Sequence, residues 1–270
     1  MKFSELNLDE SVLQAIEAMN FEECTPVQEH TIPVILEGRD LIGVAQTGTG
    51  KTAAFLLPIL NQLSKGGYPE DSINCIIMAP TRELAQQIDQ QMEGFSYFMP
   101  ASSVAVYGGN DGIRFEQEKR GLTLGADVVI ATPGRLISHL SLGYVDLSRV
   151  SFFILDEADR MLDMGFYDDI MQIVKFLPKE RQTIMFSATM PAKIQQLAQS
   201  ILNNPVEVKL AVSKPAEKII QAAYVCYEHQ KLGIIQSLFK NQAPERVIVF
   251  ASKKLKVKEV AQAFHRMGLN

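Results

Sequence analysis

The sequence predicts a doubly wound α/β fold with a mainly parallel sheet, followed by the start of a second α/β domain. Short, continuous apolar runs alternate with longer stretches of helical periodicity, as expected for strands that crossover helices cover on both faces. A loop rich in Gly and Thr joins the first of these runs to its helix. The 270 residues are 47% hydrophobic, which suffices for one large core and a smaller second unit.

The N-terminal part predicts two helices before the first strand. Apolar residues recur at helical spacing from Ser11 to Met19. A second helix begins after Thr25, a favourable N-cap, with proline at its first position and Gln28 completing a capping box. The run Leu41 to Val44 predicts a buried strand, and the helix Lys51 to Leu63 follows the loop.

The alternation of strands and helices then continues along the chain. We expect strands at Cys75 to Ala79, Val104 to Tyr107, Val128 to Ala131, Phe152 to Leu155 and Thr183 to Phe186. We expect helices at Glu83 to Phe98, Phe115 to Leu122, Gly134 to Leu140, Tyr167 to Phe176 and Ala192 to Leu202. The pattern loosens through Val206 to Lys209, so a first domain of residues 1–208 is expected to lead into a linker at 209–218.

Residues 219–270 predict the start of another parallel α/β unit. The expected strands are Ala222 to Cys226 and Val247 to Phe250, and the expected helices are Gln230 to Phe239 and Lys254 to Met267. These are too few strands to close a sheet, so we expect an incomplete domain.

The net charge of -5 is divided unevenly along the chain. Residues 1–210 hold 16 Lys and Arg against 27 Asp and Glu, whereas residues 211–270 hold 10 against 4. The basic segment could meet phosphate groups, but a solvated charged helix is the favoured interpretation, particularly for Lys253 to Lys258. Because the sequence has neither a run of about 18 apolar residues nor a signal peptide, we expect a cytoplasmic protein without membrane contact.

The cysteines and histidines form no pattern typical of a metal or disulfide site. Cys24, Cys75 and Cys226 are far apart and odd in number, so we expect them to be buried small hydrophobic residues. The four histidines have no recurring spacing, and we expect structural or surface roles for them.

The stretch from Ala45 to Thr52 predicts a phosphate-binding loop. Its glycines let backbone N–H groups turn inward, and the following helix presents the positive end of its dipole to an anion. In this pattern Lys51 reaches the outer phosphates and the Thr52 hydroxyl ligates Mg²⁺. Ala45 stands where the generic pattern has glycine, and a plain surface turn is the alternative interpretation.

An acidic pair follows one of the predicted strands. Asp156 and Glu157 come directly after the apolar run Phe152 to Leu155. A carboxylate pair at this point is typical of the Walker B arrangement, with Asp156 towards the metal and Glu157 placed to polarise water. The pair alone would also suit an ordinary helix N-terminus, because carboxylates favour that end of the helix dipole.

Continued as Asp156-Glu157-Ala158-Asp159, this segment resembles the DEAD-box ATP-dependent RNA helicases, and within that family the bacterial RhlE-type group. The resemblance implies an N-terminal RecA-like P-loop domain and a truncated part of a second one. It implies ATP and Mg²⁺ as cofactors, the metal being held by Thr52 and Asp156.

The stretch Phe21 to Gln28 resembles the Q motif, in which the glutamine reads the adenine edge and an aromatic residue packs on the base. Asn20 replaces the usual glycine. The implied nucleotide-binding residues are Phe21, Thr25, Gln28, Gln46, Thr47, Gly48, Thr49, Gly50, Lys51 and Thr52.

Further motifs resemble those with which the family contacts the RNA backbone. They are Pro80-Thr81-Arg82-Glu83-Leu84, Gly108-Gly109 and Thr132-Pro133-Gly134-Arg135. The implied RNA-binding residues are Pro80, Thr81, Arg82, Gly109, Thr132, Gly134 and Arg135. Hydroxyls, backbone N–H groups and arginines of this kind suit phosphate oxygens, which predicts sequence-independent binding of single-stranded or duplex RNA. Turn and helix-start chemistry is the alternative for each motif alone.

The resemblance implies how the reaction is divided among residues. Lys51, Asp156 and Glu157 would serve ATP hydrolysis, and Ser187-Ala188-Thr189 resembles the motif that couples hydrolysis to strand separation, which implies roles for Ser187 and Thr189. We expect a monomer that unwinds RNA locally. Because the family's later motifs, including its arginine finger, do not occur before Asn270, we expect this chain alone to bind ATP but to hydrolyse it slowly.

Two other function classes stay open from the sequence. One is a different P-loop enzyme, such as a DNA helicase or a GTPase, although the guanine motif Asn-Lys-x-Asp is not found. The other is a non-catalytic binding module in which the nucleotide only supports the fold. The presence of both Glu157 and Ser187-Ala188-Thr189 speaks against that module for the intact protein.

Overall fold

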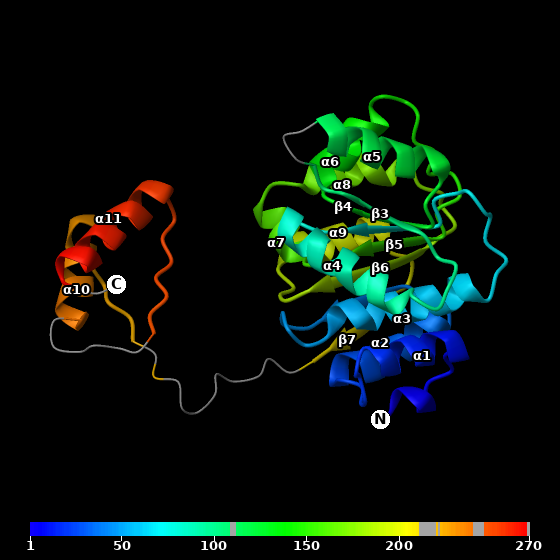
Figure 1. The fold of residues 1–270 in the computed structure, drawn as a ribbon, viewed down its shortest axis with the longest axis horizontal. Helices are drawn as coiled ribbons and strands as arrows, with labels where there is room; N and C mark the ends of the chain where they lie inside the picture. The colour runs from blue at the N-terminus through cyan, green and yellow to red at the C-terminus, as the bar shows by residue number, and fades with distance from the viewer. Residues whose placement is uncertain (109–111, 211–219, 221, 240–245, 269–270) are drawn as a thin grey trace. The chain divides into compact units, whose positions relative to one another are not determined.

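The computed structural model describes residues 1–108, 112–210, 220, 222–239 and 246–268, and Figure 1 traces the chain. Internal contacts divide the chain into two units, Met1–Ser213 and Lys214–Asn270. The boundary between these units falls inside the segment that we expected to be a linker, most of which lies outside the described residues. Gly109, one of the residues implied to bind RNA, also lies outside them.

The first unit is built on a seven-stranded sheet in the order β3-β4-β2-β5-β6-β1-β7. All its strand pairs are parallel. The strands are β1 Leu41–Val44, β2 Cys75–Met78, β3 Ser103–Val106, β4 Val128–Ala131, β5 Phe152–Leu155, β6 Gln182–Ser187 and β7 Val206–Lys209. The predicted α/β class with a parallel sheet is therefore confirmed.

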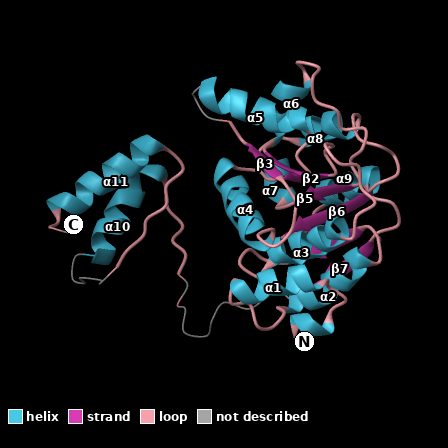
Figure 2. Ribbon diagram, turned by 45° about the vertical axis from the view of Figure 1, so that its right-hand side comes forward, coloured by secondary structure: helices cyan, strands magenta, loops and turns pink. Residues whose placement is uncertain are grey.

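Helices cover both faces of this sheet, as Figures 1 and 2 show. They are α1 Glu10–Ala18, α2 Pro26–Leu36, α3 Lys51–Ser64, α4 Arg82–Phe95, α5 Gly112–Leu124, α6 Pro133–Leu140, α7 Ala158–Asp163, α8 Tyr167–Val174 and α9 Ala192–Ile201, with a 3₁₀ turn at Phe3–Glu5. Successive strand residues point to opposite faces, so Ile77 and Ile154 belong to one core cluster and Ile76 and Phe153 to the other. Burial on both faces explains why these strands are continuous apolar runs.

The structure corrects the interpretation of Val206 to Lys209. This segment does not lead irregularly into a linker but forms the edge strand β7, which pairs in parallel with β1. Its residues alternate between half-buried and exposed, because an edge strand has one covered side and one that faces water. The sequence Val-Glu-Val-Lys has that period of two and lacks the unbroken apolar run of the central strands. Helix α7, directly after the acidic pair, was likewise not predicted.

The second unit contains the predicted helices but not the predicted strands. A 3₁₀ turn at Glu228–Gln230 precedes α10 Lys231–Phe239, and α11 spans Lys254–Arg266. Residues 222–226 and 247–250 form no strand, and side chains such as Val225 and Phe250 are almost fully exposed. A strand needs a neighbour for its backbone hydrogen bonds, and the described part of this unit offers none.

The cysteines and the helices were also compared with what the sequence predicts. Cys75 is buried as predicted, but Cys24 and Cys226 are only half-buried, so the expectation of three buried cysteines is wrong for these two. No helix within the described residues combines the length and the apolar character that crossing a membrane requires.

Candidate functional site

Most of the predicted site residues in the described part of the chain lie at one edge of the sheet, because the carboxyl ends of parallel strands all meet there. Phe21, Thr25 and Gln28 instead precede β1. The sheet order divides this edge into two halves. The loops after β5, β6 and β1, three adjacent strands, carry the residues implied to bind and hydrolyse the nucleotide. The loops after β4 and β2, also adjacent, carry the described residues implied to bind RNA. The border between the halves runs between β2 and β5, which pair directly.

The phosphate loop connects β1 to α3 and has the backbone that its glycines allow. Gly48 and Gly50 have φ values of 83° and 89°, in the left-handed region that costs other residues energy. A Cβ at Gly50 would lie 2.6 Å from Gln28 Nε2, so a larger residue would have to displace this amide as well as adopt the left-handed backbone. The N-terminus of α3 at Lys51 follows at once and directs free N–H groups towards the loop.

Gln28 joins the start of α2 to this loop. Its Oε1 accepts a hydrogen bond from the Thr25 amide at 2.9 Å, and its Nε2 donates to the Gly50 carbonyl at 3.0 Å. The side chain is buried and does not line the cleft described below, whereas its predicted role is to read adenine. The capping interaction and the loop contact therefore coexist in one side chain.

Lys51 and Asp156 form a buried pair beneath the loop. Lys51 Nζ lies 3.2 Å from the Ala45 carbonyl oxygen and 4.0 Å from Asp156 Oδ1. Burial raises the pKa of Asp156 to about 6, although Lys51 acts in the opposite direction; the negative charge of Glu157 raises it further. A divalent cation would restore the ionised carboxylate, because positive charge favours that form.

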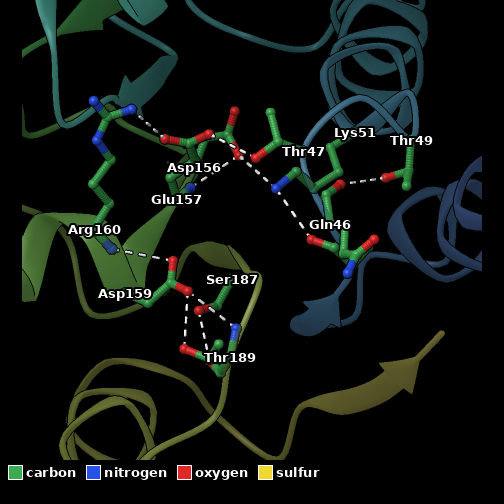
Figure 3. Close-up of polar contacts among 11 residues, drawn as sticks. Gln46, Thr47, Thr49, Lys51, Asp156, Glu157, Asp159, Arg160, Ser187 and Thr189 are labelled. Carbon is green, nitrogen blue, oxygen red and sulfur yellow. Dashed lines mark hydrogen bonds and ion pairs between the residues drawn. The ribbon is translucent and has the colours of Figure 1, made fainter. Parts of the chain in front are cut away.

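Glu157 has a strained backbone that fixes the direction of its side chain. Its φ of 52° is left-handed, which is uncommon outside glycine. The Glu157 amide donates to Asp156 Oδ1 at 2.9 Å. The carboxylate accepts from Thr47 Oγ1 at 3.2 Å and from an Arg160 guanidinium nitrogen at 3.2 Å (Figure 3). Glu157 is thereby held between the phosphate loop and α7.

Asp159 connects the acidic segment to the end of β6. Its Oδ2 accepts hydrogen bonds from the Thr189 amide at 3.0 Å and the Thr189 hydroxyl at 2.9 Å. Ser187, which is buried, donates through its hydroxyl to the Thr189 carbonyl at 2.7 Å (Figure 3). Ser187 and Thr189 therefore meet the acidic segment through Asp159 and do not line the cleft.

A cleft of about 320 Å³ gathers most of the predicted nucleotide residues. Its lining comprises Phe21, Thr47, Gly48, Gly50, Lys51, Thr52, Ala53, Leu84, Gln87, Gln91, Asp156 and Glu157. Thr25, Gln28, Gln46 and Thr49 are outside this lining; Thr49 instead donates to the Gln46 carbonyl at 2.8 Å. Gln87 and Gln91 were not predicted. Their spacing in the sequence could have indicated them, because two residues four apart lie on the same face of a helix such as α4.

The aromatic side of the cleft is supported by the N-terminus. Phe21 is half-buried, with ring centroids 6.5 Å from Phe3 and 5.6 Å from Phe95. Asn20, which replaces the family's usual glycine, has a φ of 59°. Asparagine is among the few residues that tolerate this conformation, so the replacement preserves the turn before Phe21.

The residues implied to bind RNA differ in how freely they present polar groups. Arg82 and Gly134 are exposed, and Pro80 is buried. Thr81 Oγ1 caps α4 by accepting from the Leu84 amide at 3.3 Å, which leaves its O–H able to donate. Thr132 occupies the N-cap position of α6 without a side-chain capping hydrogen bond, and it is half-buried. Arg135 is engaged: its Nε donates to Glu118 Oε2 at 2.6 Å.

The pKa of Asp156 predicts a pH dependence of metal-assisted nucleotide binding. The folded pKa of about 6 exceeds the ordinary 3.8, so the ligand-free fold binds this proton more tightly than the unfolded chain does. The resulting stabilisation of the fold is fully present below pH 3.8 and is lost as the pH rises through 6. Below pH 6 a cation must displace this proton. We therefore expect the gain in nucleotide affinity that Mg²⁺ provides to shrink about tenfold for each pH unit below 6.

A fluorescent ADP titrated with and without Mg²⁺ between pH 5 and pH 8 measures that gain. The phosphate groups also titrate in this range, so Asp156→Asn is the reference that retains their titration but lacks the carboxylate. Equal pH profiles for the wild type and Asp156→Asn would contradict the prediction.

Comparison with known proteins agrees with this geometry. Residues 25–197 match the family described as DEAD/DEAH box helicase. The chain is 41% identical over 268 residues to the ATP-dependent RNA helicase CshA of Listeria monocytogenes, covering 99% of this chain and 50% of that protein. It is 41% and 39% identical to the DEAD-box ATP-dependent RNA helicases CshA of Geobacillus kaustophilus and Bacillus subtilis, covering 98% of this chain and 56% and 53% of theirs. The chain thus spans about half the length of these relatives.

Proposed function

Because the chain belongs to the DEAD/DEAH box helicase family, we propose that the protein couples ATP binding and hydrolysis to sequence-independent RNA binding and local duplex unwinding. The observation that carries the proposal is one connected polar group: Lys51, Asp156 and Glu157 at the cleft, with Asp159 extending it to Thr189. Relatives named as ATP-dependent RNA helicases support the same activity.

ATP and Mg²⁺ are the proposed cofactors. The donor set suits a magnesium ion, which prefers oxygen ligands: the Asp156 carboxylate and the Thr52 hydroxyl both line the cleft. When bound, Mg²⁺ would neutralise charge on the outer phosphates. Lys51 would hold those phosphates, and the loop from Gln46 to Gly50 would surround them with backbone donors. Phe21 would pack on the base, and Thr25 and Gln28 would select adenine.

In the reaction Glu157 would orient the attacking water and accept its proton. The carboxylate is suited to this because its backbone is constrained and Thr47 and Arg160 hold its two oxygens. Thr189 and Ser187 would sense the state of the acidic segment through Asp159. RNA phosphates would lie across the other half of the edge, on Pro80, Thr81, Arg82, Gly109, Thr132, Gly134 and Arg135.

The wider organisation is part of the proposal. We assign the residues up to the end of β7 at Lys209 to the RecA-like ATP-binding domain, those from there to residue 218 to a linker, and 219–270 to an incomplete start of a second domain. The protein would act as a monomer in the cytoplasm, without membrane contact.

The test measures nucleotide choice and RNA stimulation in the complete gene product. We expect ATP to compete with a fluorescent ADP at least about tenfold better than GTP, because Gln28 can pair with the adenine edge but not equally with guanine. We also expect single-stranded RNA to stimulate ATP turnover. Equal competition by GTP would contradict the adenine site, and stimulation by DNA equal to that by RNA would favour a DNA helicase. ATP binding without turnover would favour a non-catalytic module.

A further inference from the structure

A buried carboxylate lies between the turn after β3 and the start of α6, in the half of the edge that carries the implied RNA-binding residues. Glu118 of α5 is 2% exposed. Its Oε1 accepts from the Gly108 amide at 2.9 Å, and its Oε2 accepts from Arg135 Nε at 2.6 Å and His139 Nε2 at 3.0 Å. Arg114 Nε lies 3.8 Å from Oε1. Burial alone raises the pKa of Glu118, but the hydrogen bonds from His139, Gly108 and Arg135 lower it below its usual value.

These contacts add to the pairing of β3 with β4, which already places the two segments side by side. Gly108 lies two residues beyond the end of β3, and Arg135 lies in the first turn of α6, after β4. The Gly108 φ of 76° turns its amide towards Glu118, and a Cβ there would meet Arg135 at 3.3 Å. One carboxylate therefore bridges the turn after β3 and the start of α6, beyond the point where the two strands stop pairing.

The rest of the cluster keeps Glu118 and Arg135 in place. The Phe115 ring stacks on His139 with centroids 4.5 Å apart, and the Arg135 guanidinium lies 4.8 Å from the same phenyl ring. His139 is fully buried, and its second ring nitrogen pairs with the Tyr144 hydroxyl. Arg135 Nη2 is buried and has no hydrogen-bond partner among the described residues. Arg135 is thus held by protein groups, and its side chain is 19% exposed.

We propose that Glu118 is a positioning residue for RNA binding, which holds the turn at Gly108 and the start of α6 at Arg135 in the arrangement that receives the RNA backbone. Arg135 then acts through this arrangement. The inference deepens the proposed function and rests on it. It assigns a role to a residue in none of the motifs described above.

The sign of the expected effect separates positioning from simple electrostatics. Removing a negative charge beside a phosphate-binding surface strengthens phosphate binding if charge is all that matters. Loss of positioning weakens it. Glu118→Gln has nearly the same shape, but its amide nitrogen must face either the Gly108 N–H or the Arg135 and His139 donors. Every orientation of the side chain therefore breaks at least one of the contacts.

The experiment measures binding of a fluorescein-labelled oligouridine to the complete gene product, with a non-hydrolysable ATP analogue present. We expect Glu118→Gln to weaken RNA binding about tenfold, the typical value of a lost hydrogen bond to a charged group, while ADP affinity changes less than about twofold. Gly108→Ala disturbs the same junction from the turn, and we expect it to weaken RNA binding while sparing ADP affinity.

Asp127→Asn is the matched control. Asp127 accepts from the Ser102 amide and hydroxyl and from Asn74 Nδ2, but it lies just before β4, at the opposite edge of the sheet. We expect it to lower thermal stability without changing RNA affinity. Thermal melts of all variants define the folded fraction to which each affinity refers.

RNA binding by folded Glu118→Gln that equals or exceeds that of the wild type would overturn the inference alone. An equal loss of RNA affinity in Asp127→Asn would also overturn it, because any destabilisation would then suffice. If the wild-type protein failed to bind RNA, the proposed function would fall, and the inference with it.

Discussion

Replacing Glu157 by glutamine is expected to lower RNA-stimulated ATP turnover about a hundredfold or more, the usual contribution of a general base. Glutamine keeps the shape of the side chain and can still accept from the Thr47 hydroxyl, which lies 3.2 Å from Glu157 Oε1. It cannot accept a proton from water. ATP affinity is expected to stay within about twofold, because Lys51 and the phosphate loop are unchanged. Steady-state turnover and binding of a fluorescent ATP analogue measure the two effects.

The appropriate control is Glu180→Gln, an exposed carboxylate in the turn before β6 that touches no part of the cleft. It removes the same charge from the same domain and is expected to leave turnover unchanged. A second control is the thermal melt, since Glu157 also pairs with Arg160. Turnover of Glu157→Gln within about twofold of the wild type would show that another group activates water.

The central strands were predictable because burial on both faces leaves a simple signal. Leu41 to Val44, Val128 to Ala131 and Phe152 to Leu155 are unbroken apolar runs, and the structure has strands at those residues. The edge strand β7 lacks that signal, since one of its sides faces water. In the second unit the error is the opposite one, because the sequence predicts strands that the structure does not have. Val247 to Phe250 has the composition of a strand, but pairing is a property of two segments, and composition reports only one.

The residues of the candidate site also differ in whether the sequence could predict them. Lys51, Asp156 and Glu157 belong to short contiguous motifs, and a motif carries its own geometry. Glu118 could not be found in that way, because α5 is mostly polar and shows no one-sided apolar face. Its burial arises only when α5 packs beside β3 and α6, which lie at different places along the chain. Asn20 is the opposite case. It departs from a motif in the sequence, and only its left-handed backbone in the structure explains why asparagine is tolerated there.

The Lys51 side chain is the other group whose loss should have a large effect. Lys51→Ala removes an ammonium whose Nζ lies 4.0 Å from Asp156 Oδ1, and both residues line the cleft. A hydrogen bond to a charged group contributes about 1.5–3 kcal/mol, so we expect ATP affinity to fall about ten- to a hundredfold. Since Lys51 also lowers the pKa of Asp156, the midpoint of Mg²⁺-assisted nucleotide binding should move to higher pH in this variant.

Lys65→Ala supplies the comparison, because Lys65 caps the other end of the same helix and its ammonium pairs with Asp9 at 4.0 Å. That variant loses the same charge from α3 but is expected to bind ATP as the wild type does. Fluorescent ATP titrations of both variants between pH 5 and pH 8 measure affinity and midpoint together. Loss of affinity without a shift of the midpoint would mean that Lys51 serves the phosphates but not Asp156. An unchanged affinity would contradict its assignment to the phosphate site altogether, since no other lysine lines the cleft within the described residues.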